Sequence, residues 1–167
     1  VWETLENLGR GPEKTRVLSF GRYERENADR QGRRAHTFDF LGFTHYCGRS
    51  RRGKFIVGRR TSRKKFRKKY QELNDWLKHV RNIAPVKEWW PILAAKLRGH
   101  YQYYGVSGNM PQLRCFYRAA VRLALKWLNR RSQRRSFNWG RFTSYLKHYP
   151  LPTPHIIHNL YTLAAVK

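Results

Sequence analysis

The 167-residue chain carries 36 Lys and Arg against 10 Asp and Glu, a formal net charge of +26. Such a charge repels itself strongly unless a polyanion or salt neutralises it, so the natural partner is nucleic acid. Apolar residues make up 40% of the chain and aromatic residues 15%, which excludes a disordered basic tail and allows a buried core. The sequence has no run of 18 apolar residues and no hydrophobic signal segment, so we expect a cytoplasmic protein that neither enters a membrane nor is secreted.

The cationic charge is concentrated in the second part of the chain. Residues 1–61 carry 14 Lys and Arg against seven Asp and Glu, whereas residues 62–167 carry 22 against three. We therefore expect the second part to face the polyanion. Glu88 is the last acidic residue, so no side-chain carboxylate after it is available to hold Mg²⁺.

The first 35 residues predict short elements. Residues 1–8 have a helical pattern that glycines and a proline end. Residues 15–20 combine β-branched and apolar side chains and predict a strand. Residues 22–35 are polar, mixed in charge and without apolar period, which predicts an exposed loop or hairpin tip.

Residues 36–58 predict a small hairpin. Apolar and polar side chains alternate over residues 36–46 around Gly42, which predicts a strand that is bent or bulged at that glycine. A basic turn at residues 48–53 then leads to a returning strand at residues 54–58.

Beyond residue 60 the apolar period changes from two to 3.6, which predicts helices. The first helix begins at a cap formed by Thr61 or Ser62, and three more are expected at about residues 86–104, 111–131 and 138–149, followed by an extended segment at residues 150–154. The side chains expected to face inward are Phe66, Tyr70, Leu73, Trp76, Leu77 and Val80 in the first helix; Trp89, Ile92, Leu93, Leu97 and Tyr101 in the second; Leu113, Phe116, Tyr117, Ala120, Val121, Ala124, Leu125, Trp127 and Leu128 in the third; and Phe142, Tyr145 and Leu146 in the fourth. The predicted fold class is α+β, a small β-rich piece followed by a three- to four-helix bundle.

Lysines and arginines crowd one side of the first predicted helix. Like charges four residues apart destabilise a helix without a counter-charge, so this density favours contact with phosphates over a merely soluble surface. A second basic group closes the long third helix, and its arginines suit phosphate oxygens and base stacking. The candidate RNA-binding residues are Arg63, Lys64, Lys65, Arg67, Lys68 and Lys69 in the first group and Arg130, Arg131, Arg134 and Arg135 in the second.

Aromatic residues lie beside glycines over residues 98–105. Aromatic rings in such a segment supply stacking platforms for unpaired bases, so Arg98, His100, Tyr101 and Tyr104 are further RNA-binding candidates. Tyr101 and Tyr104 also fall at core spacing, and packing stays the alternative role for at least one of them.

The sequence shows no catalytic or metal-binding constellation. The acidic residues are scattered and form no DD or DxD pair of the kind that two-metal chemistry needs. His45 with Cys47, and His155 with His158, are too few for a zinc site. We therefore expect this chain to bind no metal or cofactor, and we expect Cys47 and Cys115 to be reduced thiols in the core.

Several segments, in order along the chain, resemble the bacterial group II intron-encoded proteins, which combine a reverse transcriptase with a maturase domain. The resembling segments are PEKTR at 12–16, FDFLGFTHY at 38–46, KLRGHYQYYGVSGN at 96–109, KWLNRRSQ at 126–133 and YPLP at 149–152. Each segment alone is a weak signal, but the five in order extend over most of the chain.

The resemblance implies two regions. Residues 1–60 resemble the end of the reverse-transcriptase palm, and residues 61–167 resemble the helical thumb, called the maturase-specific or X domain. Within the first region, Lys14 resembles a palm lysine that approaches the leaving pyrophosphate. The same region contains four residues that resemble the primer-grip hairpin of the family: Phe40, Leu41, Gly42 and Phe43.

The resemblance also implies a function. The chain is expected to bind group II intron RNA in the bacterial cytoplasm and to assist intron folding, splicing and mobility. Primer–template nucleic acid and, through the parent protein, a second copy are further expected partners. The parent family is an RNA-directed DNA polymerase, but its aromatic-Ala-Asp-Asp strand is absent here, so we expect the isolated chain to be inactive and Mg²⁺ to bind only with those missing carboxylates.

Two alternatives stay open at the level of sequence. The first is an active polymerase, if the chain is a fragment of a longer product that supplies the palm. The second is a general basic nucleic-acid-binding scaffold without intron specificity.

Overall fold

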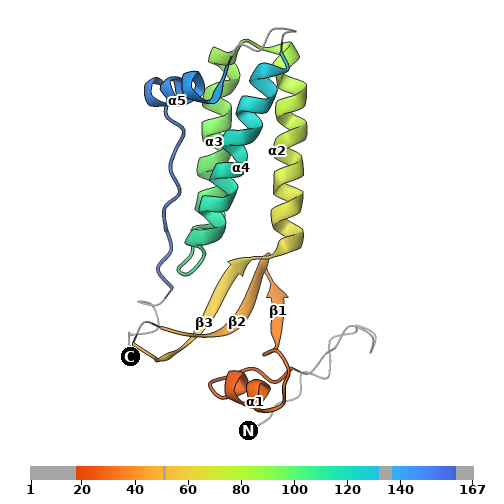
Figure 1. The fold of residues 1–167 in the computed structure, drawn as a ribbon, viewed down its shortest axis with the longest axis vertical. Helices are drawn as coiled ribbons and strands as arrows, with labels where there is room; N and C mark the ends of the chain where they lie inside the picture. Colours follow the sequence, from red (N-terminus) through yellow and green to blue (C-terminus); the bar gives the residue numbers. More distant parts are fainter. Residues whose placement is uncertain (1–17, 51, 132–136, 161–167) are drawn as a thin grey trace. The chain divides into compact units, whose positions relative to one another are not determined.

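A computed structural model describes residues 18–50, 52–131 and 137–160 (Figure 1). The elements, in chain order, are α1 (Glu24–Arg30), β1 (Thr37–Phe40), β2 (Phe43–Arg49), β3 (Phe55–Thr61), α2 (Arg63–Ile83), α3 (Val86–Tyr104), α4 (Met110–Asn129) and α5 (Trp139–His148). The strands form one antiparallel sheet in the order β1-β2-β3. The predicted fold class, mixed α and β with a mainly helical second part, is therefore confirmed.

The chain divides into two compact units. The smaller unit contains the described residues up to Thr37 together with Tyr46–Val57, and the helical unit contains Phe38–His45 and the described residues from Gly58 onward. The boundary that the sequence places at residue 60 stays a prediction.

In the smaller unit a seven-residue helix, α1, replaces the loop predicted for residues 22–35. The carboxylate of its first residue, Glu24, is buried and accepts hydrogen bonds from Arg33 and from the backbone N–H of His36. The Arg33 guanidinium, helped by that N–H, lowers the pKa of Glu24 to about 2. The prediction was wrong because contacts with residues nine and twelve positions away stabilise this helix, and its own residues have no apolar period.

Two further strand predictions need correction. The strand predicted for residues 15–20 lies partly outside the described residues, and its described part, Leu18–Phe20, is not a strand. The helix predicted for residues 1–8 lies wholly outside them. Residues 36–46 form two strands joined by a turn at Leu41 and Gly42, where a single bent strand was expected.

The turn at Leu41 and Gly42 has positive φ at both residues, 48° and 82°. Two-residue turns of this kind match the twist of the flanking strands, and glycine adopts them without strain. Leu41 does so at a cost of about 1–2 kcal/mol. The β2–β3 hairpin, by contrast, follows the predicted arrangement.

All four predicted helices are present, with the bounds of the second reproduced and those of the third and fourth within two residues. The Ser62 hydroxyl caps α2 by accepting a hydrogen bond from the backbone N–H of Lys65, and the Asn138 side chain caps α5 in the same way. These caps satisfy backbone donors that the first turn of a helix leaves without partners.

The core of the helical unit lies among α2, α3 and α4, and aromatic rings fill much of it. Phe66 of α2 meets Phe116 of α4 edge to face, with ring centroids 5.9 Å apart. On α3 the predicted inward residue Ile92 is 48% exposed, whereas Trp90 is buried. The reason is that the indole N–H of Trp90 donates to the Tyr149 carbonyl, so the segment after α5 covers this side of the helix.

The segment after α5 runs back along α3 (Figure 1). The Tyr101 hydroxyl donates to the Pro152 carbonyl at 3.0 Å, and Val106 pairs with His158 in a parallel bridge. The extended path predicted for residues 150–154 is therefore consistent with the structure, which places no helix or strand there.

Both cysteines have free thiols, but their environments differ. Cys47 is buried, whereas Cys115 is exposed on α4. The expectation that both lie in the core is therefore wrong for Cys115, because α4 turns its neighbour Phe116 inward instead.

A fully buried amide, Asn109, joins three elements of the helical unit. Its Oδ1 accepts from the backbone N–H of Thr61 at 2.8 Å, and its Nδ2 donates to the Thr61 hydroxyl and to the Tyr104 carbonyl. Thr61 ends β3, Tyr104 ends α3, and Asn109 precedes α4. One side chain thus fixes where a strand and two helices meet.

We expect Asn109→Ala to lower the free energy of unfolding by about 2–4 kcal/mol, because the backbone N–H of Thr61 loses its partner and the Tyr104 carbonyl keeps only the bond from the Val106 N–H. Urea denaturation followed by circular dichroism measures this change. Asn82→Ala, on the exposed surface of α2, is the control and should change stability by less than about 0.5 kcal/mol. Equal stability of both variants would show that the hydrogen bonds of Asn109 contribute little to the free energy of unfolding.

Candidate nucleic-acid interface

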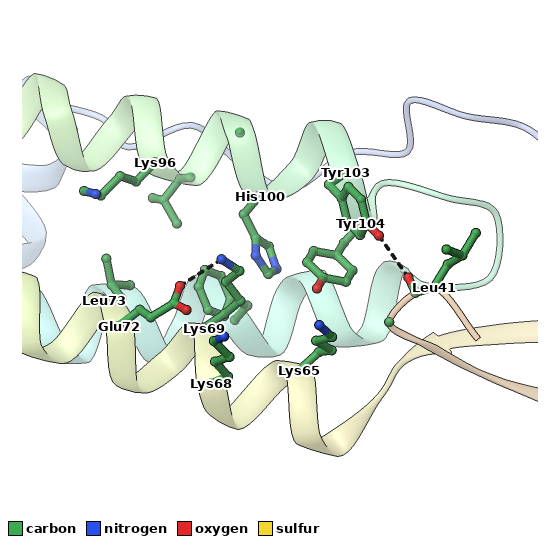
Figure 2. Close-up of a pocket in the computed structure, with 14 residues that line it drawn as sticks. Leu41, Lys65, Lys68, Lys69, Glu72, Leu73, Lys96, His100, Tyr103 and Tyr104 are labelled. Carbon is green, nitrogen blue, oxygen red and sulfur yellow. Dashed lines mark hydrogen bonds and ion pairs between the residues drawn. The ribbon is translucent and has the colours of Figure 1, made fainter. Parts of the chain in front are cut away.

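A cleft of about 810 Å³ lies in the helical unit between α2 and α3, and we call it the α2–α3 cleft (Figure 2). Phe116 of α4 also lines it, as does the β1–β2 turn. Its lining residues are Leu41, Gly42, Lys65, Lys68, Lys69, Glu72, Leu73, Lys96, Leu97, Gly99, His100, Tyr103, Tyr104 and Phe116.

The charge of the cleft is mainly positive. Lys65, Lys68 and Lys69 come from α2, and Lys96 comes from α3. Among the lining residues Glu72 is the one carboxylate, and it accepts a hydrogen bond from the Lys69 ammonium at 2.8 Å. This bond lowers the pKa of Glu72. Four cations against one anion favour an anionic ligand.

His100 forms part of the cleft wall as an aromatic, uncharged group. Its ring stacks on Phe116, with centroids 3.7 Å apart and planes at 12°, and lies 4.7 Å from the Tyr104 ring. Burial, with a smaller effect from the charge of Lys69, lowers the pKa of His100 to about 4. At neutral pH the imidazole therefore has one nitrogen that donates and one that accepts hydrogen bonds.

The adjacent aromatic residues of α3 have different roles in the structure. Tyr101 is fully buried and bonded to Pro152, so its ring packs in the core. Tyr104 is 4% exposed but lines the cleft. Tyr103, which the sequence patterns did not single out, is 55% exposed and also lines the cleft. The signal that identifies it is its spacing of three from His100, which places both on one helix face.

Tyr103 is held in place although it is exposed. Its hydroxyl donates to the Leu41 carbonyl at 3.0 Å, as Figure 2 shows. Its ring lies nearly parallel to Phe43, at 11° and 6.2 Å, and edge-on to Tyr104 at 4.7 Å. Of the four residues at 40–43, Leu41 and Gly42 line the cleft and the buried Phe43 packs behind Tyr103, whereas Phe40 is 59% exposed and does not line it.

The structure brings only part of the predicted RNA-binding set into the cleft. Lys65, Lys68, Lys69, His100 and Tyr104 line it. The exposed predicted residues that do not line it are Arg63, Lys64, Arg67, Arg98, Arg130 and Arg131. Lys14, Arg134 and Arg135 lie outside the described residues.

A further stripe of cationic side chains runs along α4. Arg114, Arg118, Arg122 and Lys126 are exposed and four residues apart, so they share one helix face. Neither the basic groups nor the aromatic segment that the sequence predicts includes these four residues, although their spacing of four identifies the stripe.

In residues 18–50, 52–131 and 137–160, His, Cys, Asp and Glu form no group of three or more that is able to hold a metal ion. None of the helices in that part of the chain is long and apolar enough to cross a membrane.

Comparisons with known proteins gave no relative. No protein-family model, no curated protein and no solved structure matches this chain.

The pKa of His100 leads to a pH prediction. Because unfolded histidine titrates near 6.5 and folded His100 near 4, the unfolded state binds more protons between these values. We therefore expect the free energy of unfolding to fall as the pH is lowered through this window, by about 2 kcal/mol between pH 7 and 4.5. In His100→Phe, which keeps a ring for stacking on Phe116, this contribution should be missing. Urea denaturation at both pH values tests it, and equal pH dependence of the two proteins would contradict it.

Proposed function

We propose that this chain is the RNA-binding maturase or thumb portion of a group II intron reverse transcriptase and assists the folding, splicing and mobility of intron RNA. The observation that carries the proposal is the α2–α3 cleft, which is lined by four lysines together with the aromatic side chains of His100, Tyr103 and Tyr104. Lysines bind phosphates and aromatic rings bind unpaired bases, and this pairing is typical of RNA recognition.

Two of the segments that resemble the maturase family meet in this cleft, which supports the specific form of the proposal. Leu41 and Gly42 come from the segment at residues 38–46, and Lys96 to Tyr104 come from the segment at residues 96–109. The hydrogen bond from Tyr103 to Leu41 joins them directly. Because the two segments build one cleft, a single binding function accounts for the resemblance of both to the maturase family.

The rival function is a general basic scaffold for nucleic acids. The exposed cations outside the cleft, above all the stripe on α4, favour this rival because they are suited to any polyanion. The two functions differ in selectivity, since charge alone does not distinguish folded RNA from duplex DNA of equal length.

We expect the triple variant Lys65→Gln, Lys68→Gln and Lys96→Gln to weaken binding of intron RNA at least about tenfold in moderate salt. The plot of log affinity against log salt should become shallower by roughly two to three units, about one for each phosphate that the variant no longer neutralises. Fluorescence anisotropy with labelled RNA over a salt series measures both quantities.

The matched control removes the same charge elsewhere. Lys78, Lys87 and Lys147 are exposed and do not line the cleft. Their triple change to Gln should have a markedly smaller effect on affinity. If both triple variants weaken binding equally, the cleft has no special role and the proposal is left without its main support.

A competition experiment separates the two functions. We expect a structured group II intron RNA to displace itself from the protein at a concentration at least about tenfold lower than duplex DNA with the same number of phosphates. Equal competition by the two polymers would favour the general scaffold.

A further inference from the structure

Helix α3 forms one wall of the cleft and presents three different surfaces in a row. Lys96, Gly99 and Tyr103 are three and four residues apart, so they lie on one face of the helix, and all three line the cleft. A cation, bare backbone and an aromatic ring therefore follow one another along about 10 Å of helix.

Gly99 lacks a packing reason to be glycine. A Cβ added there meets no atom within 4 Å, and its place inside α3 gives it ordinary helical backbone. Glycine is nevertheless among the least favourable residues in a helix interior, so stability alone favours a larger residue. The open space at Gly99 instead allows a bound molecule to approach the α3 backbone closely.

Tyr103 provides a fixed ring next to this space. The bond to Leu41 and the packing on Phe43 and Tyr104 restrict the ring before any ligand arrives. A preorganised ring loses little conformational entropy when a base stacks on it. Such a platform is suited to any of the bases, because each has a π face.

We propose that the α2–α3 cleft holds one unpaired nucleotide of a bound RNA, with its base stacked on Tyr103, its ribose against the bare backbone of Gly99 and its phosphate at Lys96. This proposal rests on the RNA-binding function proposed above and names the structural element of the RNA that the site takes.

The size and chemistry of the cleft favour a single nucleotide over a duplex. Its volume of about 810 Å³ lies within the range of sites that hold one small molecule. A base in a duplex is stacked and paired, so it enters such a site only when it is unpaired, as in a bulge or loop. The neutral imidazole of His100, with a donor and an acceptor, is able to pair with a base edge.

The test compares two fluorescein-labelled RNA hairpins that differ in one nucleotide. One carries a single unpaired adenosine bulge, and the other lacks it and is fully paired. We expect the full 167-residue chain to bind the bulged hairpin about five- to tenfold more tightly, the contribution of stacking one base. An abasic residue in the bulge should remove that difference.

Gly99→Leu closes the proposed ribose site without harming the helix, since leucine is a good helix former. We expect it to reduce affinity for the bulged hairpin to that for the paired hairpin and to leave the paired hairpin unaffected. Gly140→Leu is the matched control, because Gly140 is an exposed glycine of α5 that does not line the cleft. Circular dichroism should show that neither variant lowers the thermal midpoint.

The outcomes separate this inference from the function on which it rests. If the wild type prefers intron RNA over duplex DNA but Gly99→Leu binds the bulged hairpin as wild type does, the nucleotide site is refuted and the RNA-binding function stands. The same conclusion follows if Gly99→Leu weakens both hairpins equally. If the wild type shows no preference for RNA at all, both proposals fail together.

Discussion

The two walls of the α2–α3 cleft share one anchor, the buried amide of Asn109. It bonds to Thr61, immediately before the Ser62 cap of α2, and to Tyr104, the last residue of α3. The start of one wall and the end of the other are therefore fixed to the same side chain. A second bond, from Tyr103 to Leu41, ties α3 to the β1–β2 turn. A binding surface built from two helices keeps its shape only when their ends are fixed in this way.

The helical unit folds although it has few carboxylates to balance its cations, and aromatic rings supply part of the missing compensation. No acidic residue follows Glu88. Around Trp127, the guanidinium of Arg81 lies 4.6 Å from the ring centroid, and Lys126 and Arg130 lie 4.9 and 5.6 Å away. Each contact of this kind contributes about 0.5–1 kcal/mol at exposed sites. The tryptophans thus serve packing and electrostatics together. Lys96 of the cleft lies over the Trp76 ring in the same way, and among the described residues Lys69 is the cleft lysine that forms an ion pair, with Glu72.

Sequence patterns predicted the elements that residues close in sequence stabilise. They failed for the elements whose conformation depends on residues farther along the chain. The helices follow from apolar period and capping residues, both of which are visible in a short window. The helix α1 does not, because Arg33 and His36 hold Glu24 from outside it. The β1–β2 turn was also missed, because a leucine such as Leu41 rarely adopts positive φ and gives no turn signal. Its conformation depends on Gly42, whose carbonyl accepts from the Ser62 N–H across the unit.

The same limit applies to the candidate site, and Tyr101 and Tyr103 show why. Two residues apart on a helix, their side chains point to nearly opposite sides, so one ring packs inward when the other faces outward. The helical pattern placed Tyr101 inward but left base stacking open as its other role, because α3 has apolar residues around most of its circumference. The segment after α5 decides: Pro152 accepts the Tyr101 hydroxyl and closes that side of the helix. Tyr103 is thereby left to the cleft, so a chain segment some fifty residues away determines which ring is available to a ligand.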